Sequence, residues 1–352
     1  MKKINKTIRF SLLIFSLCLF ISCELFYEQS PGRIILIGVG LDYIGEDESS
    51  TSDINGNAAL ENPPNDIREI AYALSTLASQ SEKTFVYIPF IQQHTIDDIP
   101  ESNYPNKDNL QKLFDELKNN NDISANVYDG NFDKSEYNLT SEYSTFGNEI
   151  TSIDNLSEND ILIFYYSGHG DQTNDGDLRL PEDKDEQVRE SIPLSFLSEN
   201  LNSLNCTVLT VLDSCGSGSF IEKSNYSVNT ITTSFVDTIP ELYETFFTSS
   251  DDNSSTSDLY AMVSTRAGEL SFDTSSLDVN HPNSIFSYYF LRALGYENDS
   301  ESEIGYVNEN IPSLSKDRIS IDSIYDYIID NISREEPLIN GGRNSLVLFN
   351  LN

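Results

Sequence analysis

The stretch ILIFYYSGHGDQ, residues 161–172, joins a run of apolar residues to a histidine that lies between two glycines. The run is typical of a buried strand, and His169 is one of only three histidines in the chain. Glycines directly after a strand allow tight turns and let backbone N–H groups approach a ligand. We therefore expect the imidazole of His169 to be presented at a strand end rather than packed in a core.

A second apolar run ends in a similar way. TVLTVLD at 207–213 leads into SCGSG, which contains Cys215. Neighbouring parallel strands expose their carboxyl ends on one edge of a sheet, and open α/β sheets bind ligands at that edge. His169 and Cys215 could therefore meet there, and the competing interpretation is that the two motifs arise independently. A thiolate could attack a carbonyl, the imidazole could move the protons, and the backbone N–H groups of Gly170 and Cys215 could hold the oxyanion.

The rest of the chain alternates strand-like and helix-like segments, which predicts an α/β fold. Further strands are expected at 33–41, 84–91, 260–268 and 345–351. Helices are expected at 65–79, 106–120, 191–204, 284–295 and 320–332. Asn65 or Asp66 is expected to cap the first of these helices. Two polar stretches, near 120–158 and 222–258, have no assignable pattern and are interpreted as a surface insertion and a long loop.

The first residues of the chain are typical of an export signal. MKKINKTIR is basic, and the apolar core FSLLIFSLCLFI is too short for a comfortable membrane span. The ending LFISCE resembles the lipobox of bacterial lipoproteins, which implies a signal peptide at 1–22, lipid on Cys23 and a short lipidated tether at 23–32. The alternatives are ordinary cleavage with release and retention as an uncleaved anchor. We expect a protein exported to the bacterial cell envelope and held at a membrane by its lipid.

The cysteine count then bears on Cys215. Without the signal, and with Cys23 lipidated, the mature domain keeps only Cys206 and Cys215. An extended strand between them would separate their α-carbons by about 30 Å, whereas a disulfide tolerates only about 7 Å. Cys215 is therefore expected to be a free thiol in an oxidising compartment. Cys206 is interpreted as a small buried residue at the start of a strand.

The net charge of the chain is -36, and its basic cluster lies within the first ten residues. Phosphate binding needs patches of Lys and Arg, so nucleic acid is not an expected partner. A field of this sign attracts cationic ligands and basic peptides. Solubility is the other interpretation of the charge.

SGHG after one apolar run, followed 46 residues later by the cysteine of DSCGSG after another, resembles the caspase superfamily and its metacaspase-like bacterial peptidases. In caspases the histidine also lies about 50 residues before the cysteine. Further segments resemble the family in the expected order: Asn65-Asp66, Ser264, SIFSYYFLRAL and EEPLINGGRNSLVLFNL. The resemblance implies a caspase-like three-layer α/β/α sandwich with a mostly parallel central sheet over 33–352. It also implies a cysteine endopeptidase that forms a thioester acyl-enzyme through a His169 and Cys215 dyad, with no third triad residue.

The same resemblance gives Asp213 a role, because in this family the residue two before the nucleophile lines the pocket for the side chain that precedes the scissile bond. A buried carboxylate needs a partner of opposite charge, which an Arg or Lys of the substrate would supply. We therefore predict protein or peptide substrates that are cleaved after Arg or Lys. The alternative role for Asp213 is to cap nearby backbone N–H groups at the strand end.

Calcium is the one metal that the sequence raises. The acidic run PEDKDEQ at 181–187, together with Asp171, Asp175 and Asp177, could bind calcium, as acidic loops of some metacaspases do. It lacks the regular spacing of a calcium loop, so a solvated acidic loop is the other interpretation. No metal site is assigned, and the expected mechanism requires no cofactor.

Two other functions remain open for a chain of this family. One is a surface-anchored binding lipoprotein that keeps the caspase-like scaffold without turnover, since fold does not establish function. The other is a transpeptidase or ligase on the same dyad. Peptide hydrolysis and acyl transfer to added amines would separate the three functions.

Overall fold

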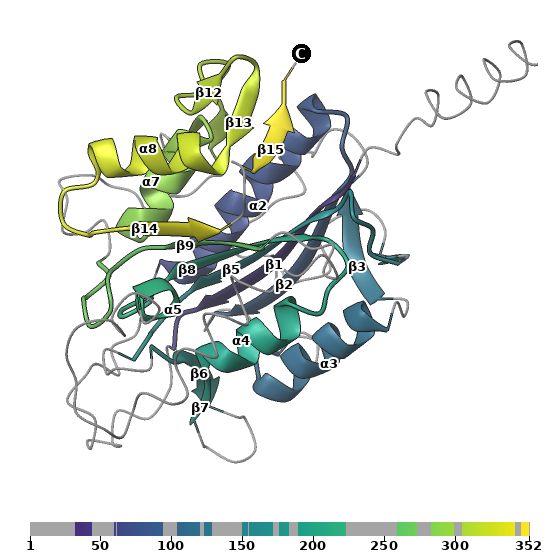
Figure 1. The fold of residues 1–352 in the computed structure, drawn as a ribbon, viewed down its shortest axis with the longest axis vertical. Helices are drawn as coiled ribbons and strands as arrows, with labels where there is room; N and C mark the ends of the chain where they lie inside the picture. The colour runs from purple at the N-terminus through teal and green to yellow at the C-terminus, as the bar shows by residue number, and fades with distance from the viewer. Residues whose placement is uncertain are drawn as a thin grey trace, which may run out of the picture.

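Figure 1 shows a central sheet between layers of helices, in a computed structural model of the chain. The structure describes residues 32–43, 60, 62–93, 104–119, 123–128, 150–153, 155–171, 176–182, 189–222, 259–272, 283–298, 305–341 and 346–351.

Eight of the described strands form the central sheet, in the order β14-β9-β8-β5-β1-β2-β3-β4. The five neighbouring parallel strands are β9 (Leu259–Val263), β8 (Thr207–Asp213), β5 (Ile161–Ser167), β1 (Ile34–Leu41) and β2 (Phe85–Gln92). The antiparallel strands are β3 (Ile123–Tyr128), β4 (Ile150–Ile153) and β14 (Leu338–Gly341). The parallel strands read as nearly continuous apolar runs because both of their faces are covered.

Helices cover both faces of this sheet (Figure 1). One layer contains α2 (Pro63–Gln80), α7 (Ile285–Ala293) and α8 (Ile321–Asn331). The other contains α3 (Lys107–Lys118), α4 (Leu194–Leu201) and the short α5 (Ser219–Glu222). The mostly parallel sheet and its two helical layers confirm the predicted α/β/α sandwich.

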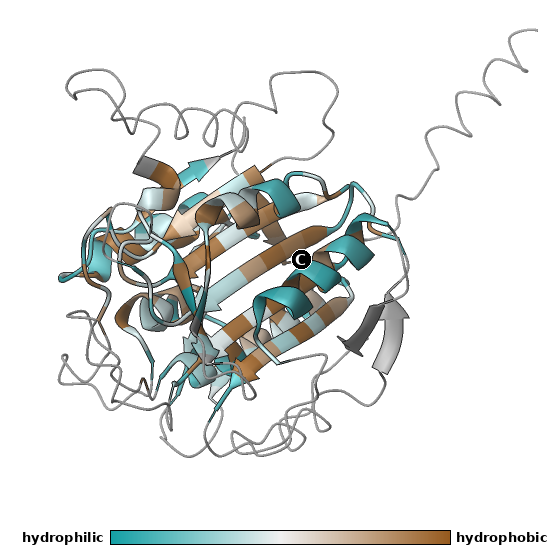
Figure 2. Ribbon diagram, turned by 90° about the horizontal axis from the view of Figure 1, so that it is seen from below, coloured by the Kyte–Doolittle hydropathy of each residue, from teal (hydrophilic) through white to brown (hydrophobic). Residues whose placement is uncertain are grey.

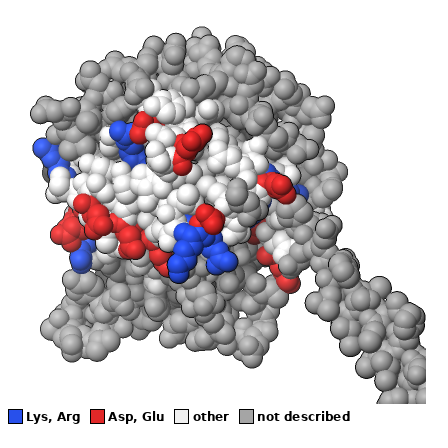
Figure 3. Space-filling view, turned by 90° about the horizontal axis from the view of Figure 1, so that it is seen from above, with Lys and Arg blue, Asp and Glu red and all other residues white. Residues whose placement is uncertain are grey.

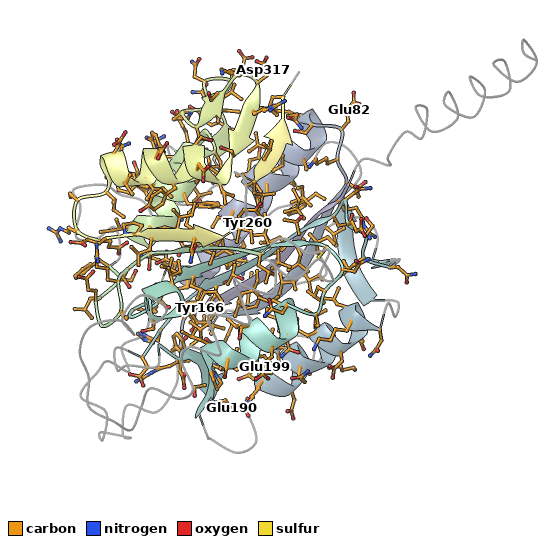
Figure 4. All side chains as sticks on the ribbon, in the orientation of Figure 1. Glu82, Tyr166, Glu190, Glu199, Tyr260 and Asp317 are labelled. Atoms are coloured by element: carbon orange, nitrogen blue, oxygen red, sulfur yellow. The ribbon has the colours of Figure 1, made fainter. Side chains whose placement is uncertain are left out.

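Alternate residues of each inner strand enter two separate apolar cores. In Figure 4, Tyr260 of β9 points into the core under α2, α7 and α8, and Tyr166 of β5 points into the core above α3 and α4. Figure 2, seen from below, shows strands with many brown (hydrophobic) bands beside helices that carry teal (hydrophilic) bands. The inner strands are therefore fixed from both sides, and so are the loops that follow them.

Three small sheets lie outside the central one among the described residues. They are β6 (Leu178–Glu182) with β7 (Arg189–Ile192), β10 (Tyr296–Glu297) with β11 (Tyr306–Val307), and β12 (Leu314–Ser315) with β13 (Arg318–Ser320) and β15 (Val347–Asn350). The predicted closing strand is thus β15, but it belongs to a small sheet, and β14 takes the edge of the central sheet.

Two expectations about the elements need correction or extension. The predicted cap of the first helix is wrong: α2 begins at Pro63 with Asn62 at its N-cap, so Asn65 and Asp66 lie in its first turn. The polar stretch 120–158, which had no assignable pattern and was interpreted as a surface insertion, contributes β3 and β4 to the central sheet. The stretch 223–258 lies outside the described residues.

The predicted signal, tether and lipid site also lie outside the described residues, which begin at Gly32. In the part of the chain that the structure describes, no helix combines the length and the apolar character needed to cross a membrane. Figure 3 shows acidic and basic side chains mixed on the described part of one face of the molecule.

Candidate active site

Two loops meet where β5 and β8 end. In the register of these parallel strands Ser167 lies opposite Asp213. His169 comes two residues after Ser167, and Cys215 comes two residues after Asp213. The N–H of Gly168 donates to the carbonyl oxygen of Asp213 at 3.2 Å, which extends the pairing beyond β5. The structure thus brings the predicted histidine and cysteine to adjacent loops at one edge of the sheet.

Gly170 lies directly against the loop of Cys215. A Cβ atom at this position would collide with the carbonyl oxygen of Cys215 and would stand 2.9 Å from Ser214 Oγ. Glycine is therefore needed for the two loops to pack this closely. No hydrogen bond from the Gly170 N–H is found within the described residues, so this donor is available to a ligand.

Tyr43, two residues after β1, contacts His169 with both its ring and its hydroxyl. The two ring centroids are 4.6 Å apart with an interplanar angle of 34°, and Tyr43 Oη accepts the His169 N–H at 3.1 Å. The His169 carbonyl oxygen accepts hydrogen bonds from Tyr166 Oη at 2.7 Å and from the Arg179 N–H at 3.0 Å. Three neighbouring segments therefore fix the backbone and the ring of His169.

Cys215 is partly exposed and is not in a disulfide. The backbone N–H of Ser271 donates to its Sγ atom at 3.4 Å, and the N–H of Gly216 donates to the Glu269 carbonyl oxygen at 2.8 Å. The segment 269–272, which comes after β9, therefore lies alongside the cysteine. A peptide substrate would have to share this space or move the segment.

Cys206 has a different environment, at the start of β8. It is free and buried, and burial raises the pKa of its thiol to about 12. Such a thiol stays protonated and unreactive at neutral pH. The expectations that Cys206 is a buried residue and that the two cysteines do not pair are confirmed.

Asp213 is 2% exposed and accepts several hydrogen bonds. Its carboxylate accepts hydrogen bonds from Ser271 Oγ at 2.9 Å and from Ser284 Oγ at 2.7 Å. It also accepts hydrogen bonds from the N–H and the Oγ of Ser287, at 3.1 and 2.6 Å. The Ser287 N–H belongs to the first turn of α7, so Asp213 does cap a nearby backbone group, the alternative role considered for it. Burial raises the pKa of Asp213 above its ordinary value.

Asp66 is a second buried carboxylate beside Asp213, and the sequence analysis assigned it no role at the site, because it took Asp66 as a helix cap and as part of the family resemblance. It comes from the first turn of α2 and accepts Ser167 Oγ at 2.7 Å and Asn283 Nδ2 at 3.0 Å. Ser284 Oγ is close enough to donate to Asp66 and to Asp213, yet a hydroxyl has one proton to donate. Burial, and next the charge of Asp213, hold the pKa of Asp66 well above its usual range.

The caspase-domain peptidase family model matches residues 53–313, which is more than half of the chain. The chain belongs to the caspase-domain family. Its fold is also similar to a crystal structure of a Geobacter sulfurreducens protein, with 14% sequence identity, 88% of this chain and 93% of that chain covered, and a TM-score of 0.41. No curated protein matches the sequence.

Membership in the caspase-domain family places this chain among cysteine peptidases and supports the predicted resemblance. Two further segments that carried the resemblance lie at the site. Ser264, which follows β9, accepts the N–H of Ser214 with its Oγ at 3.2 Å and so steadies the turn before Cys215. Glu335, in the segment before β14, accepts a hydrogen bond from Ser271 Oγ at 3.1 Å.

The acidic residues considered for calcium are only partly described in this caspase domain. Asp177 directly precedes β6, and its carbonyl oxygen accepts a hydrogen bond from the Asp171 N–H at 2.9 Å. Asp175 and residues 183–188 lie outside the described residues. Within the described part, no group of three or more His, Cys, Asp or Glu side chains could hold a metal ion.

Proposed function

We propose that this chain is a cysteine endopeptidase in which Cys215 is the nucleophile, His169 transfers the protons, and cleavage follows Arg or Lys. The observation that carries the proposal is the meeting of the two loops after β5 and β8, where Gly170 packs against the backbone of Cys215. Family membership supports the peptidase class. The buried carboxylates beside the loops support the cationic specificity.

The reaction follows from the chemistry of these groups. His169 takes the thiol proton of Cys215, and the sulfur attacks the scissile carbonyl carbon. The negative oxygen that forms is held by the backbone N–H groups of Gly170 and Cys215. The C–N bond then breaks, His169 protonates the leaving amine, and a thioester remains. Water, deprotonated by His169, hydrolyses the thioester, and the sulfur leaves and is protonated again.

The specificity follows from the lack of a positive partner. Within the described residues no Lys or Arg forms a salt bridge with Asp66 or Asp213. Two carboxylates this close favour ionisation only when a cation joins them. An Arg or Lys side chain of the substrate supplies that cation. Its N–H groups can donate to both carboxylates, whereas the Ser284 hydroxyl has a single proton to donate. Arg266, the basic residue of the nearby loop, pairs instead with Glu336 at the surface.

The function is tested by offering fluorogenic peptides that end in Arg, Lys or Asp, with and without calcium. We expect turnover of the Arg and Lys peptides that is lost in Cys215→Ala and kept in the matched control Cys206→Ala. Turnover of Asp peptides alone would overturn the pocket assignment, and activity in Cys215→Ala would overturn the nucleophile. Binding without hydrolysis would favour the binding lipoprotein, and acyl transfer to added amines would favour the transpeptidase.

We extend the proposal to the location of the enzyme. A lipid on Cys23 would leave the tether 23–32 before the first described strand, a reach of roughly 35 Å at most. The enzyme would then act close to the membrane surface of the cell envelope. Mass spectrometry of the protein from membranes should find lipid on Cys23, and Cys23→Ala should release the chain from the membrane. An unmodified Cys23 in the membrane fraction would favour an uncleaved anchor.

A further inference from the structure

A third carboxyl group, that of Glu335, shares a hydroxyl with Asp213. Glu335 is 5% exposed, and its Oε1 atom accepts the Phe272 N–H at 2.7 Å and Ser271 Oγ at 3.1 Å. Ser271 Oγ is also within 2.9 Å of Asp213 Oδ1. Glu335 and Asp213 are therefore separated by a single hydroxyl group, and that hydroxyl belongs to the residue whose N–H contacts Cys215 Sγ.

The hydroxyl groups at this site have too few protons to give every carboxyl oxygen a hydrogen bond. Ser271 and Ser284 each lie between two carboxyl groups but have one proton each to donate. In the part of the chain that the structure describes, the second oxygen of Glu335, Oε2, is buried without a hydrogen-bond partner. A buried carboxyl oxygen without a hydrogen-bond partner is costly, so the site favours a ligand that brings several N–H groups.

Basic residues close to Glu335 do not supply these donors. Arg334 and Glu336, its neighbours in the chain, are exposed, and so are Arg266 and Glu269 in the facing segment. Arg266 forms its ion pair with Glu336. The charged groups that act on the Glu335 carboxyl are instead the acids Asp213 and Asp66.

We propose that Glu335 is a specificity-determining residue of this pocket, where it joins Asp66 and Asp213 and favours Arg over Lys in the residue before the scissile bond. The inference rests on the proposed cleavage after basic residues. A guanidinium has five N–H donors in a planar fork that can reach two carboxylates at once. The ammonium of Lys is a compact charge with three donors, so it gains less from the third acid.

Binding of the cation should also release a proton. Burial, and next the charge of Asp213, raise the pKa of Glu335 to about 9, so this group is protonated at pH 7.5 in the free protein. A guanidinium favours the ionised carboxylate, and the proton then leaves to solvent. The proton count separates a carboxyl that meets the ligand from one that only supports the fold.

The test uses calorimetric titration of the full chain carrying Cys215→Ala with two peptide amides that end in Arg and in Lys. Adding Glu335→Gln should raise the Kd of the Arg peptide about tenfold or more. The Kd of the Lys peptide should rise less, with a change in log Kd of under half that for the Arg peptide. Titration in two buffers of different ionisation enthalpy should show that the parent releases about one proton more per Arg peptide than the Glu335→Gln variant does. The matched control is the exposed neighbour, Glu336→Gln, which should leave both quantities unchanged.

Glu335→Asp keeps the charge and should recover part of the Arg preference, and circular dichroism of each variant reports its folding. If Glu335→Gln is folded and binds both peptides like the parent, the inference is wrong while the proposed peptidase stands. If Glu335→Gln unfolds, the result for Glu335→Asp decides. The inference is then wrong if Glu335→Asp leaves both the Arg preference and the proton count unchanged. If neither peptide binds the parent and neither is cleaved by the wild-type chain, the proposed function fails, and the inference fails with it.

Discussion

Tyr43 is the residue that most directly orients His169. Its ring lies 4.6 Å from the imidazole between centroids, and its hydroxyl accepts the His169 N–H. Its backbone has a φ of 54°, a conformation that costs free energy for a bulky residue unless the surroundings hold it.

We expect Tyr43→Phe to lower kcat about tenfold, because it leaves the backbone N–H of His169 without this acceptor. Tyr43→Leu also removes the ring that packs against the imidazole, so it should lower kcat further. The measurement is kcat and KM of Arg-peptide turnover for both variants. A purely structural role would lower the melting temperature of both variants and leave kcat in place.

Asp213 determines the charge preference of the site in this account. We expect Asp213→Asn to lower kcat/KM for Arg and Lys peptides by about a hundredfold or more, since a buried cation would lose its main partner. Turnover of a peptide that ends in Gln should change much less. Equal losses of kcat/KM for Arg and Gln peptides would show that Asp213 supports the fold by capping α7 and does not bind the basic side chain of the substrate.

The sequence predicts His169 and Cys215 at this scale because they follow two recognisable apolar strands, and the resemblance to the caspase family adds Asp213, the last residue of the second strand. Asp66 and Glu335 could not be assigned in the same way. Asp66 looks like a helix-start residue, and Glu335 lies in the acidic pair of EEPL far along the chain. Only the folded sheet brings α2 and the segment before β14 to hydroxyls that Asp213 also contacts, Ser284 for Asp66 and Ser271 for Glu335.

At the scale of elements, the position of α2 on β1 decides where Asp66 lies. A Cβ atom on Gly40 would stand 2.7 Å from the carbonyl oxygen of Pro63 and 2.8 Å from Ile67 Cγ1. Both belong to the first turns of α2, on either side of Asp66 in the chain. Gly40 therefore lets the helix start approach the sheet closely enough to deliver this carboxylate.

We expect Gly40→Ala to push the start of α2 outward and to destabilise the fold by about 1–3 kcal/mol. The same shift moves Asp66, so KM for Arg peptides should rise. Urea denaturation measures the first effect and peptide kinetics the second, with Gln80→Ala at the exposed far end of α2 as the control. A loss of stability without any change in KM would mean that Asp66 does not meet the substrate.

The strength of each element's pattern decides how well the sequence predicts it. β5 and β8 match the predicted bounds because strands buried on both faces appear as apolar runs. The start of α2 was misplaced because Pro63 and Pro64 fit the first turn of a helix, where the missing N–H costs nothing. β14 was missed because its four residues include Asn340 and Gly341 and it lies at the edge of the sheet.

At the scale of the whole molecule, the buried acids should make stability depend on pH. The folded protein raises the pKa of Asp66, Asp213 and Glu335, in each case first by burial. Between the ordinary carboxyl pKa and the raised one, the folded state therefore binds more protons than the unfolded state. Stability must then fall as the pH rises through this window, up to about 9 for Glu335.

We predict that the melting temperature is highest near pH 5 and declines towards pH 9. Repulsion from the net charge of -36 acts in the same direction, so the wild-type trend is not specific to these acids. Glu335→Gln provides the specific comparison, because it should flatten the decline between pH 7 and pH 9. An unchanged slope in this variant would mean that Glu335 is already ionised in the folded protein.

The central claim is that Cys215 attacks the carbonyl of a substrate held by its basic side chain, and covalent labelling tests it most directly. The full chain is incubated with a peptidyl ketone that ends in Arg and alkylates thiolates, and the labelled residue is identified by mass spectrometry. We predict one adduct, on Cys215, that is much reduced in His169→Ala and in the presence of excess Arg peptide. A label on Cys206, or no label while Arg peptides are still cleaved, would contradict the account.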